Sequence, residues 1–93
     1  MDSRGAAVSG WRRADEGDVP EVGQEITMVV FRSGDEGFQR WRRMRVDVLF
    51  NREGAVPRIY GAGLPCDTML TEPWPERPDD INGRAIFWKE FEP

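Results

Sequence analysis

Arginine and tryptophan gather in one stretch of the sequence, FQRWRRMRVDVLF at residues 38–50. All four of its arginines and Trp41 fall within the six residues 40–45. Guanidinium groups bind phosphates and carboxylates, and an indole ring offers a flat surface for a base or an apolar side chain. The stretch is therefore consistent with three roles: a solvated strand face balanced by acids elsewhere, a protein-binding surface, or a strand that tracks a nucleic-acid backbone.

The charge of the chain is distributed unevenly around this stretch. Residues 32–58 hold seven arginines and four acids, whereas residues 1–31 have a net charge of −3 and residues 59–93 one of −4. Acidic flanks folded against the basic strand would neutralise it within the molecule. The overall charge of −4 would also weaken the salt-dependent attraction that dominates nucleic-acid binding. We therefore expect a protein partner, with nucleic acid as the alternative.

Arginine and tryptophan are also the residue types most enriched at the energetic hot spots of protein interfaces. On this ground Trp41, Arg43 and Arg45 are candidate partner-binding residues. Trp74 joins them because the prolines on either side restrict its backbone, which lowers the entropy lost when the indole docks. The same ring is equally suited to fill the core, so both interpretations stay open.

The acidic residues Asp79 and Asp80 are further candidates for partner binding, because carboxylates can mimic a nucleic-acid backbone toward a basic partner site. Together with Asp67 they also raise the question of a divalent cation. Their spacing lacks the alternate-position oxygen ligands of a calcium loop, so we expect no metal site.

The sequence lacks the usual groups of enzyme catalysis. It contains no histidine to serve as a base or a zinc ligand, and neither a P-loop nor a G-x-G-x-x-G motif. The only cysteine, Cys66, is predicted to be a small buried apolar residue or an unreactive loop thiol, because the sequence indicates no cationic partner for it. We therefore expect no catalytic residue and no cofactor.

The elements that would position these residues are strands. Residues 25–32 predict a central strand because both of its faces are apolar, and residues 33–37 a turn. The i, i+3 spacing of Phe38, Trp41 and Met44 also fits a single helical turn. Because no capping residue precedes Phe38 and Gly37 disfavours a helix start, residues 38–50 predict a continuous strand with a bulge near Arg42. Its alternation places one set of side chains on one side, Met44, Val46, Val48 and Phe50, and the other set on the opposite side, Arg43, Arg45, Asp47 and Leu49.

The remaining segments complete a small β domain. Pro57 makes residues 55–60 an edge strand, and the four prolines of residues 61–83 predict a long loop. Residues 84–91 are predicted to form the last strand, and Trp11 and Trp88 are predicted to lie in the core. Residues 1–10 are expected to be frayed and residues 11–93 to form a single domain. The fold class is mainly β: an antiparallel sheet or partly open barrel of about four strands, with room for one short helix.

The class of protein is bounded by composition. No apolar run reaches the roughly 18 to 20 residues of a membrane span, which predicts a cytoplasmic protein without membrane contact. Twelve of the thirteen basic residues are arginine, a bias typical of GC-rich coding.

A resemblance adds to this interpretation. The opening pattern is W-x-x-x-x-E-x-x-x-P-x-x-G-Q-x-I, carried by Trp11, Glu16, Pro20, Gly23, Gln24 and Ile26, and the chain closes on IFWKEFEP at residues 86–93. These features resemble small phage and prophage domains of unknown function that open on tryptophan and a P-x-x-G turn and end on an aromatic-tryptophan strand. Such domains often carry histidine where this chain has Phe87. The resemblance implies a compact β-rich fold and a mobile-element origin.

From these points we expect a non-catalytic accessory protein that binds and inhibits a host macromolecular complex, in the manner of anti-CRISPR inhibitors. A nucleic-acid-binding β domain is the alternative, and a structural phage protein that forms oligomers is a third possibility. The protein is expected to be a monomer or a small homo-oligomer.

Overall fold

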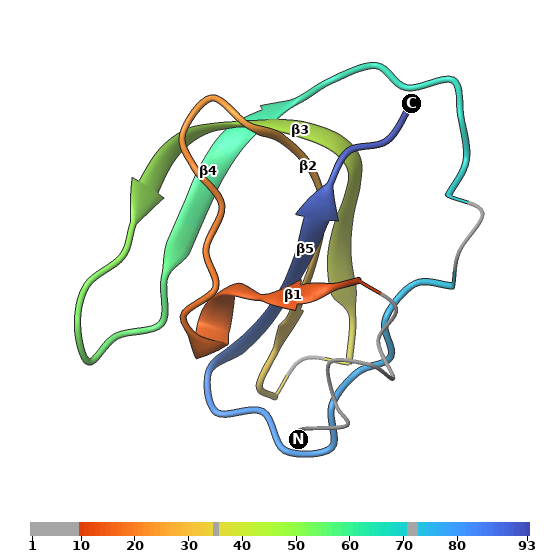
Figure 1. Cartoon of the computed structure of the whole chain (residues 1–93). Helices are drawn as coiled ribbons and strands as arrows, with labels where there is room; N and C mark the ends of the chain where they lie inside the picture. Colours follow the sequence, from red (N-terminus) through yellow and green to blue (C-terminus); the bar gives the residue numbers. More distant parts are fainter. Residues whose placement is uncertain (1–9, 35, 71–72) are drawn as a thin grey trace.

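The computed structural model describes residues 10–34, 36–70 and 73–93, which form one five-stranded antiparallel sheet. Its elements are β1 (Arg12–Arg13), the 3-10 turn η1 (Ala14–Glu16), β2 (Glu25–Arg32), β3 (Phe38–Phe50), β4 (Arg58–Gly63) and β5 (Arg84–Glu90). The strand order is β1-β5-β2-β3-β4, and the sheet is strongly curved (Figure 1). The predicted mainly β fold is confirmed. Of the segment 1–10 predicted to be frayed, all but Gly10 lies outside the described residues.

The central position predicted for residues 25–32 is confirmed, because β2 pairs with β3 on one side and with β5 on the other. Both faces of β2 are buried, as its apolar composition requires. One strand was missing from the prediction: β1 has only two residues, which is too short for any periodicity to show. It pairs Arg12 with Trp88 and Arg13 with Phe87 at the edge of the sheet.

Each face of the sheet carries its own apolar cluster. The first face is formed by Ala14, Ile26, Met28, Val30, Met44, Val46, Ile86 and Trp88. The second face is formed by Trp11, Val29, Phe31, Ala85 and Phe87. Alternate residues of β2 and β5 therefore enter different clusters, as the period-two geometry of a strand requires. The predicted core positions of Trp11 and Trp88 are confirmed, with 6% and 1% of their surfaces exposed.

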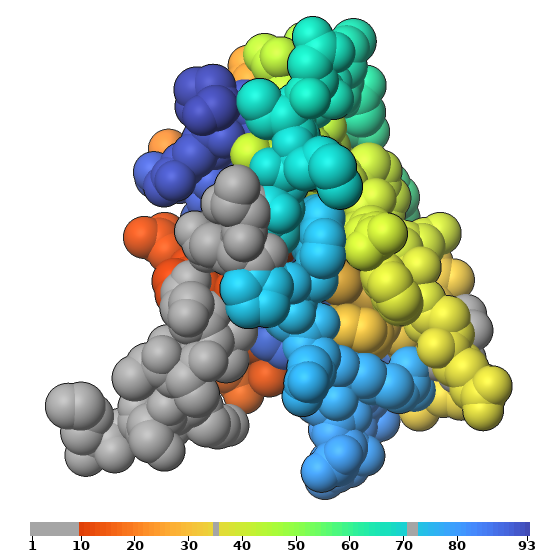
Figure 2. Space-filling model, turned by 90° about the vertical axis from the view of Figure 1, so that its right-hand side faces the viewer, coloured from red at the N-terminus to blue at the C-terminus, as the bar shows by residue number. Residues whose placement is uncertain are grey.

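Loops, together with the short turn η1, cover the two faces. Val19 and Val56 pack against the first cluster, and the indole Nε1 of Trp88 donates to the carbonyl of Asp18 at 2.6 Å. Leu70, Trp74 and Ile81 pack against the second cluster. Figure 2 shows the described part of this loop, residues 64–83, passing over one side of the molecule beside β3. The proline-rich segment is thus a cover for the second face.

The bulge predicted near Arg42 is present in β3. Ile26 pairs with Met44 and Met28 with Trp41, so that Arg42 and Arg43 together lie opposite Thr27. The extra residue allows both arginines to reach partners on the second face, where Thr27 and Glu25 lie.

A second register shift, between Val46 and Val48, was not predicted and corrects the expected alternation. The extra residue is Asp47, and beyond it the two sides of the strand exchange. Val48 and Phe50, expected on the side of Met44, are exposed at 43% and 57%, while Leu49 is half-buried opposite Ile59. The ring of Phe50 instead meets that of Tyr60 edge to face, with centroids 5.7 Å apart.

The predicted edge strand and final strand are confirmed with shifted limits. β4 begins after Pro57 and runs to Gly63, so the long loop begins at Leu64. Within the described ranges, no helix is long and apolar enough to cross a membrane.

Candidate functional site

The arginines of β3 all lie on the second face, whereas Trp41 lies on the first. Register places Arg40 opposite Val29 and Arg45 opposite Glu25, both on the second-face side of β2. Trp41 pairs with Met28 and packs against the first cluster. The predicted anchors therefore do not form one site.

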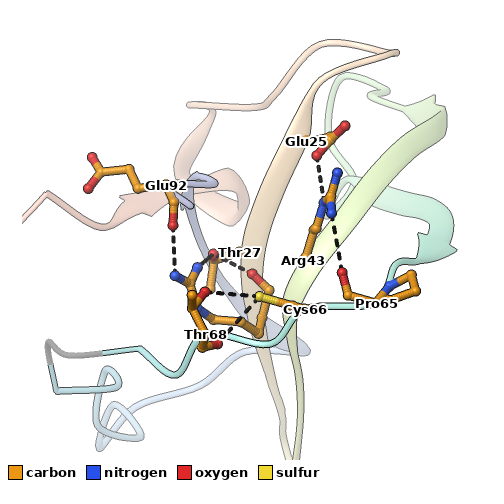
Figure 3. A network of polar contacts seen from close by, with 8 residues as sticks. Glu25, Thr27, Arg43, Pro65, Cys66, Thr68 and Glu92 are labelled. Carbon is orange, nitrogen blue, oxygen red and sulfur yellow. Dashed lines mark hydrogen bonds and ion pairs between the residues drawn. The ribbon is translucent and has the colours of Figure 1, made fainter.

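Arg43 is held by acceptors on two neighbouring elements (Figure 3). Its Nε donates to Glu25 Oε1 at 2.7 Å, and its Nη1 donates to the carbonyl of Pro65 at 3.2 Å. The hydrogen bond from Arg43 lowers the pKa of Glu25, and the same contact raises the pKa of Arg43. The Arg43 guanidinium also lies over the ring of Phe91, 5.1 Å from its centroid.

The neighbouring residue Arg42 joins β2, β3 and the C-terminal segment. Thr27, which is fully buried, donates from Oγ1 to the Arg42 carbonyl at 2.7 Å and accepts from Arg42 Nη1 at 3.1 Å. Nη2 of Arg42 donates to the carbonyl of Glu92 at 2.8 Å. These bonds fasten the end of the chain to the bulge, so Arg42 is a structural residue.

Arg45 has a local partner, since its Nε donates to Asp47 Oδ1 at 3.0 Å. Together with the Arg43 pair, this contact supports the first of the three predicted roles, a strand face balanced within the molecule. Glu25 belongs to the acidic flank of residues 1–31, as expected, whereas Asp47 lies within the basic stretch itself.

Arg40 differs from these three arginines. Its guanidinium lies over two rings, 5.3 Å from the centroid of Phe38 and 5.1 Å from that of Trp74. Within the described residues it has no carboxylate or carbonyl partner. Phe38 is 51% exposed and Trp74 is half-buried. We call Phe38, Arg40 and Trp74 the aromatic-cation surface.

Contacts behind this surface hold it in place. The ring of Trp74 lies 5.9 Å from that of Trp11, and the ring of Phe38 lies 5.7 Å from that of Phe31. Trp11 and Phe31 belong to the second apolar cluster. The rings of Trp74 and Phe38 therefore pack on the core. This packing limits the side-chain entropy that they would lose on binding a partner.

Sequence reasoning identified Trp74 but missed Phe38 and Arg40 as its companions. The alternation of β3 places Phe38 and Arg40 on one side, so that half of the surface was accessible from the pattern. The approach of Trp74, 34 positions along the chain from Arg40, depends on how the loop folds over the sheet.

None of the ring contacts of this surface involves the acidic candidates. Asp79 and Asp80 are exposed in the loop between β4 and β5. Across residues 10–34, 36–70 and 73–93, no three acidic, cysteine or histidine side chains come close enough together to hold a metal ion.

Cys66 requires a correction, because the fold supplies the cationic neighbours that the sequence did not indicate. Its Sγ lies 3.2 Å from the hydroxyl of Thr68, and the charges of Arg42 and Arg43 act on it. The hydrogen bond from Thr68 and, to a lesser degree, these two arginines lower the pKa of the thiol. The bulge of β3 brings the arginines there.

Three comparisons with known proteins were made: with family models, with curated proteins and with solved structures. None of the three found a match to this chain. The resemblance to phage and prophage domains stays a prediction.

Proposed function

We propose that this protein is a non-catalytic binding protein that engages a host macromolecular complex through the aromatic-cation surface. The observation that carries the proposal is the Arg40 guanidinium, which lies over two partly exposed rings and has no acid partner within the described part of the chain. The other three arginines of β3 already have partners in the molecule. Among the described residues, Arg40 is thus the arginine of β3 without an acid or carbonyl partner.

The chemistry of this surface favours an acidic segment of a protein. A partner carboxylate would accept a charge-assisted hydrogen bond from Arg40, while contact with Phe38 and Trp74 would remove apolar surface from water. Such a combination of arginine with aromatic rings is typical of interface hot spots. Binding by occlusion fits the expectation of an anti-CRISPR-like inhibitor that works in the host cytoplasm.

The proposal is tested by affinity capture from the lysate of a GC-rich bacterial host. The bait is the wild-type chain, with Arg40→Glu as the test variant and Arg52→Glu as the control, because Arg52 is exposed on the turn between β3 and β4. We expect a stoichiometric host complex with the wild type and the control, and its loss with Arg40→Glu. Equal capture by all three baits would contradict the proposed surface.

Single-stranded nucleic acid is the second candidate partner, because Phe38 and Trp74 provide the two aromatic rings that a stacking strand requires beside a cation. Gel shift at low salt with single- and double-stranded oligonucleotides distinguishes the candidates. Retention of single strands by the wild type, lost in Arg40→Glu and retained in Arg52→Glu, would favour nucleic acid over an acidic protein.

A further inference from the structure

A pocket lies on the side of the sheet opposite the aromatic-cation surface. This pocket has a volume of about 320 Å³, and Met28, Trp41 and Ile86 are among the residues that line it. This volume lies at the lower end of the range of small-molecule sites, roughly 300–1,000 Å³. None of the described residues that line it carries a carboxylate.

Two arginines on neighbouring strands line this pocket. Arg32 and Arg84 both line it, and they are direct cross-strand partners in the pairing of β2 with β5. Side chains in such positions have Cβ atoms about 5 Å apart, and like charges placed there repel each other. Neither guanidinium has an ion pair with a described residue. An anion bound between the two arginines would relieve this repulsion.

We propose that the pocket binds a small organic anion, whose phosphate or carboxylate group lies between Arg32 and Arg84. The planar guanidinium groups suit both kinds of oxyanion, because each can donate two parallel hydrogen bonds. The flat apolar body of the ligand packs on Trp41 and Met28, where ring stacking and a polarisable sulfur favour an aromatic group. The adjacent Gln39 supplies an amide that can donate or accept a hydrogen bond.

This site is independent of the proposed function. Trp41 and Arg40 are adjacent in sequence but point to opposite faces of β3, so the pocket and the aromatic-cation surface do not overlap. Loss of one by mutation should leave the other intact.

The inference is tested with four probes: adenosine 5′-monophosphate, adenosine, indole-3-acetate and inorganic phosphate. Binding is followed by nuclear magnetic resonance of the indole N–H groups, with the Trp41 signal assigned from Trp41→Phe. We expect at least one of the two aromatic anions to shift the Trp41 signal and to bind about tenfold or more tightly than adenosine. The tighter of the two identifies a phosphate or a carboxylate as the preferred group. Equal binding of adenosine, or no shift of the Trp41 signal with either anion, overturns the inference.

Variants of the arginine pair provide the second arm. Arg32→Gln and Arg84→Gln should each weaken binding of the preferred anion about tenfold or more, while the matched control Arg52→Gln leaves it unchanged. Because each glutamine removes one of two repelling charges, the free variants should unfold at temperatures no lower than the wild type. A variant that keeps its fold, judged by its amide spectrum, and retains wild-type affinity would overturn the assignment. Using both variants keeps the test decisive if one of them fails to fold.

Discussion

Arg43 of β3 donates to Glu25 of the neighbouring strand β2, with 2.7 Å between Nε and Oε1, although the residue directly opposite Glu25 in the register is Arg45. The bulge in β3 makes this offset possible, because it adds one residue to that strand between Trp41 and Met44. Arg45 is left to pair with Asp47 on its own strand. The bulge thus allows Arg43 and Arg45 to have separate carboxylate partners.

The Arg43 pair predicts a pH-dependent contribution to stability. The pKa of Glu25 is lowered in the folded protein, so its contribution is fully present above the ordinary value of 4.5 and is lost as pH falls through the lowered pKa. Glu25→Gln should therefore reduce the free energy of unfolding modestly at pH 7 and hardly at all in strong acid. Urea unfolding at both pH values checks this. Glu53→Gln, on an exposed turn, is the control and should show no such dependence.

The thiol of Cys66 should react faster than an ordinary cysteine near neutral pH. Its pKa is lowered from 9.0, mainly by the hydrogen bond from Thr68, and the thiolate is the reactive form. The rate of alkylation by iodoacetamide, measured against pH, should have its midpoint below 9.0 in the folded protein. Thr68→Val should move that midpoint upward, and the urea-unfolded chain should show the ordinary value. A folded midpoint at or above that of the unfolded chain would contradict the assignment.

Two glycines of β4 should differ sharply in their tolerance of alanine. A Cβ built on Gly61 would lie 2.0 Å from the carbonyl oxygen of Arg45, a backbone atom that cannot move without breaking the strand pair. At Gly63 the nearest atom is Trp41 Cδ1 at 3.6 Å, which is an ordinary contact. We expect Gly61→Ala to lower the free energy of unfolding by about 2 kcal/mol or more and Gly63→Ala by far less. Chemical denaturation of both variants measures the difference.

Trp74 should contribute to stability as well as to binding. Its ring packs on the second apolar cluster and lies 5.9 Å from Trp11. Trp74→Ala should lower the free energy of unfolding by roughly 1–3 kcal/mol, since the ring is half-buried. Trp74→Phe should restore much of this loss, because it keeps an aromatic ring against the cluster. A Trp74→Ala variant as stable as the wild type would show that the loop does not hold the second face.

Patterning along the chain was sufficient for much of the fold. The two apolar faces of residues 25–32 predicted the central strand. The spacing of Trp41 and Met44, in a segment without a helix start, predicted the bulge near Arg42. Such features are local, because alternation and turn residues act over a few positions. The alternation of residues 43–50 gave no sign of the second bulge, at Asp47. The exposure of the Val48 and Phe50 side chains was therefore not predicted.

The candidate site depended much more on tertiary contacts. Residue types drew attention to the arginines of residues 40–45. Only the folded sheet separates Arg43, which is paired with Glu25, from Arg40, which lies over the rings of Phe38 and Trp74. The meeting of Arg32 with Arg84 likewise joins strands 52 positions apart. Local sequence determines which way a side chain points along its strand. Which distant group it meets is decided by strand order, register and the path of the covering loop, because these bring together residues that no short-range pattern relates.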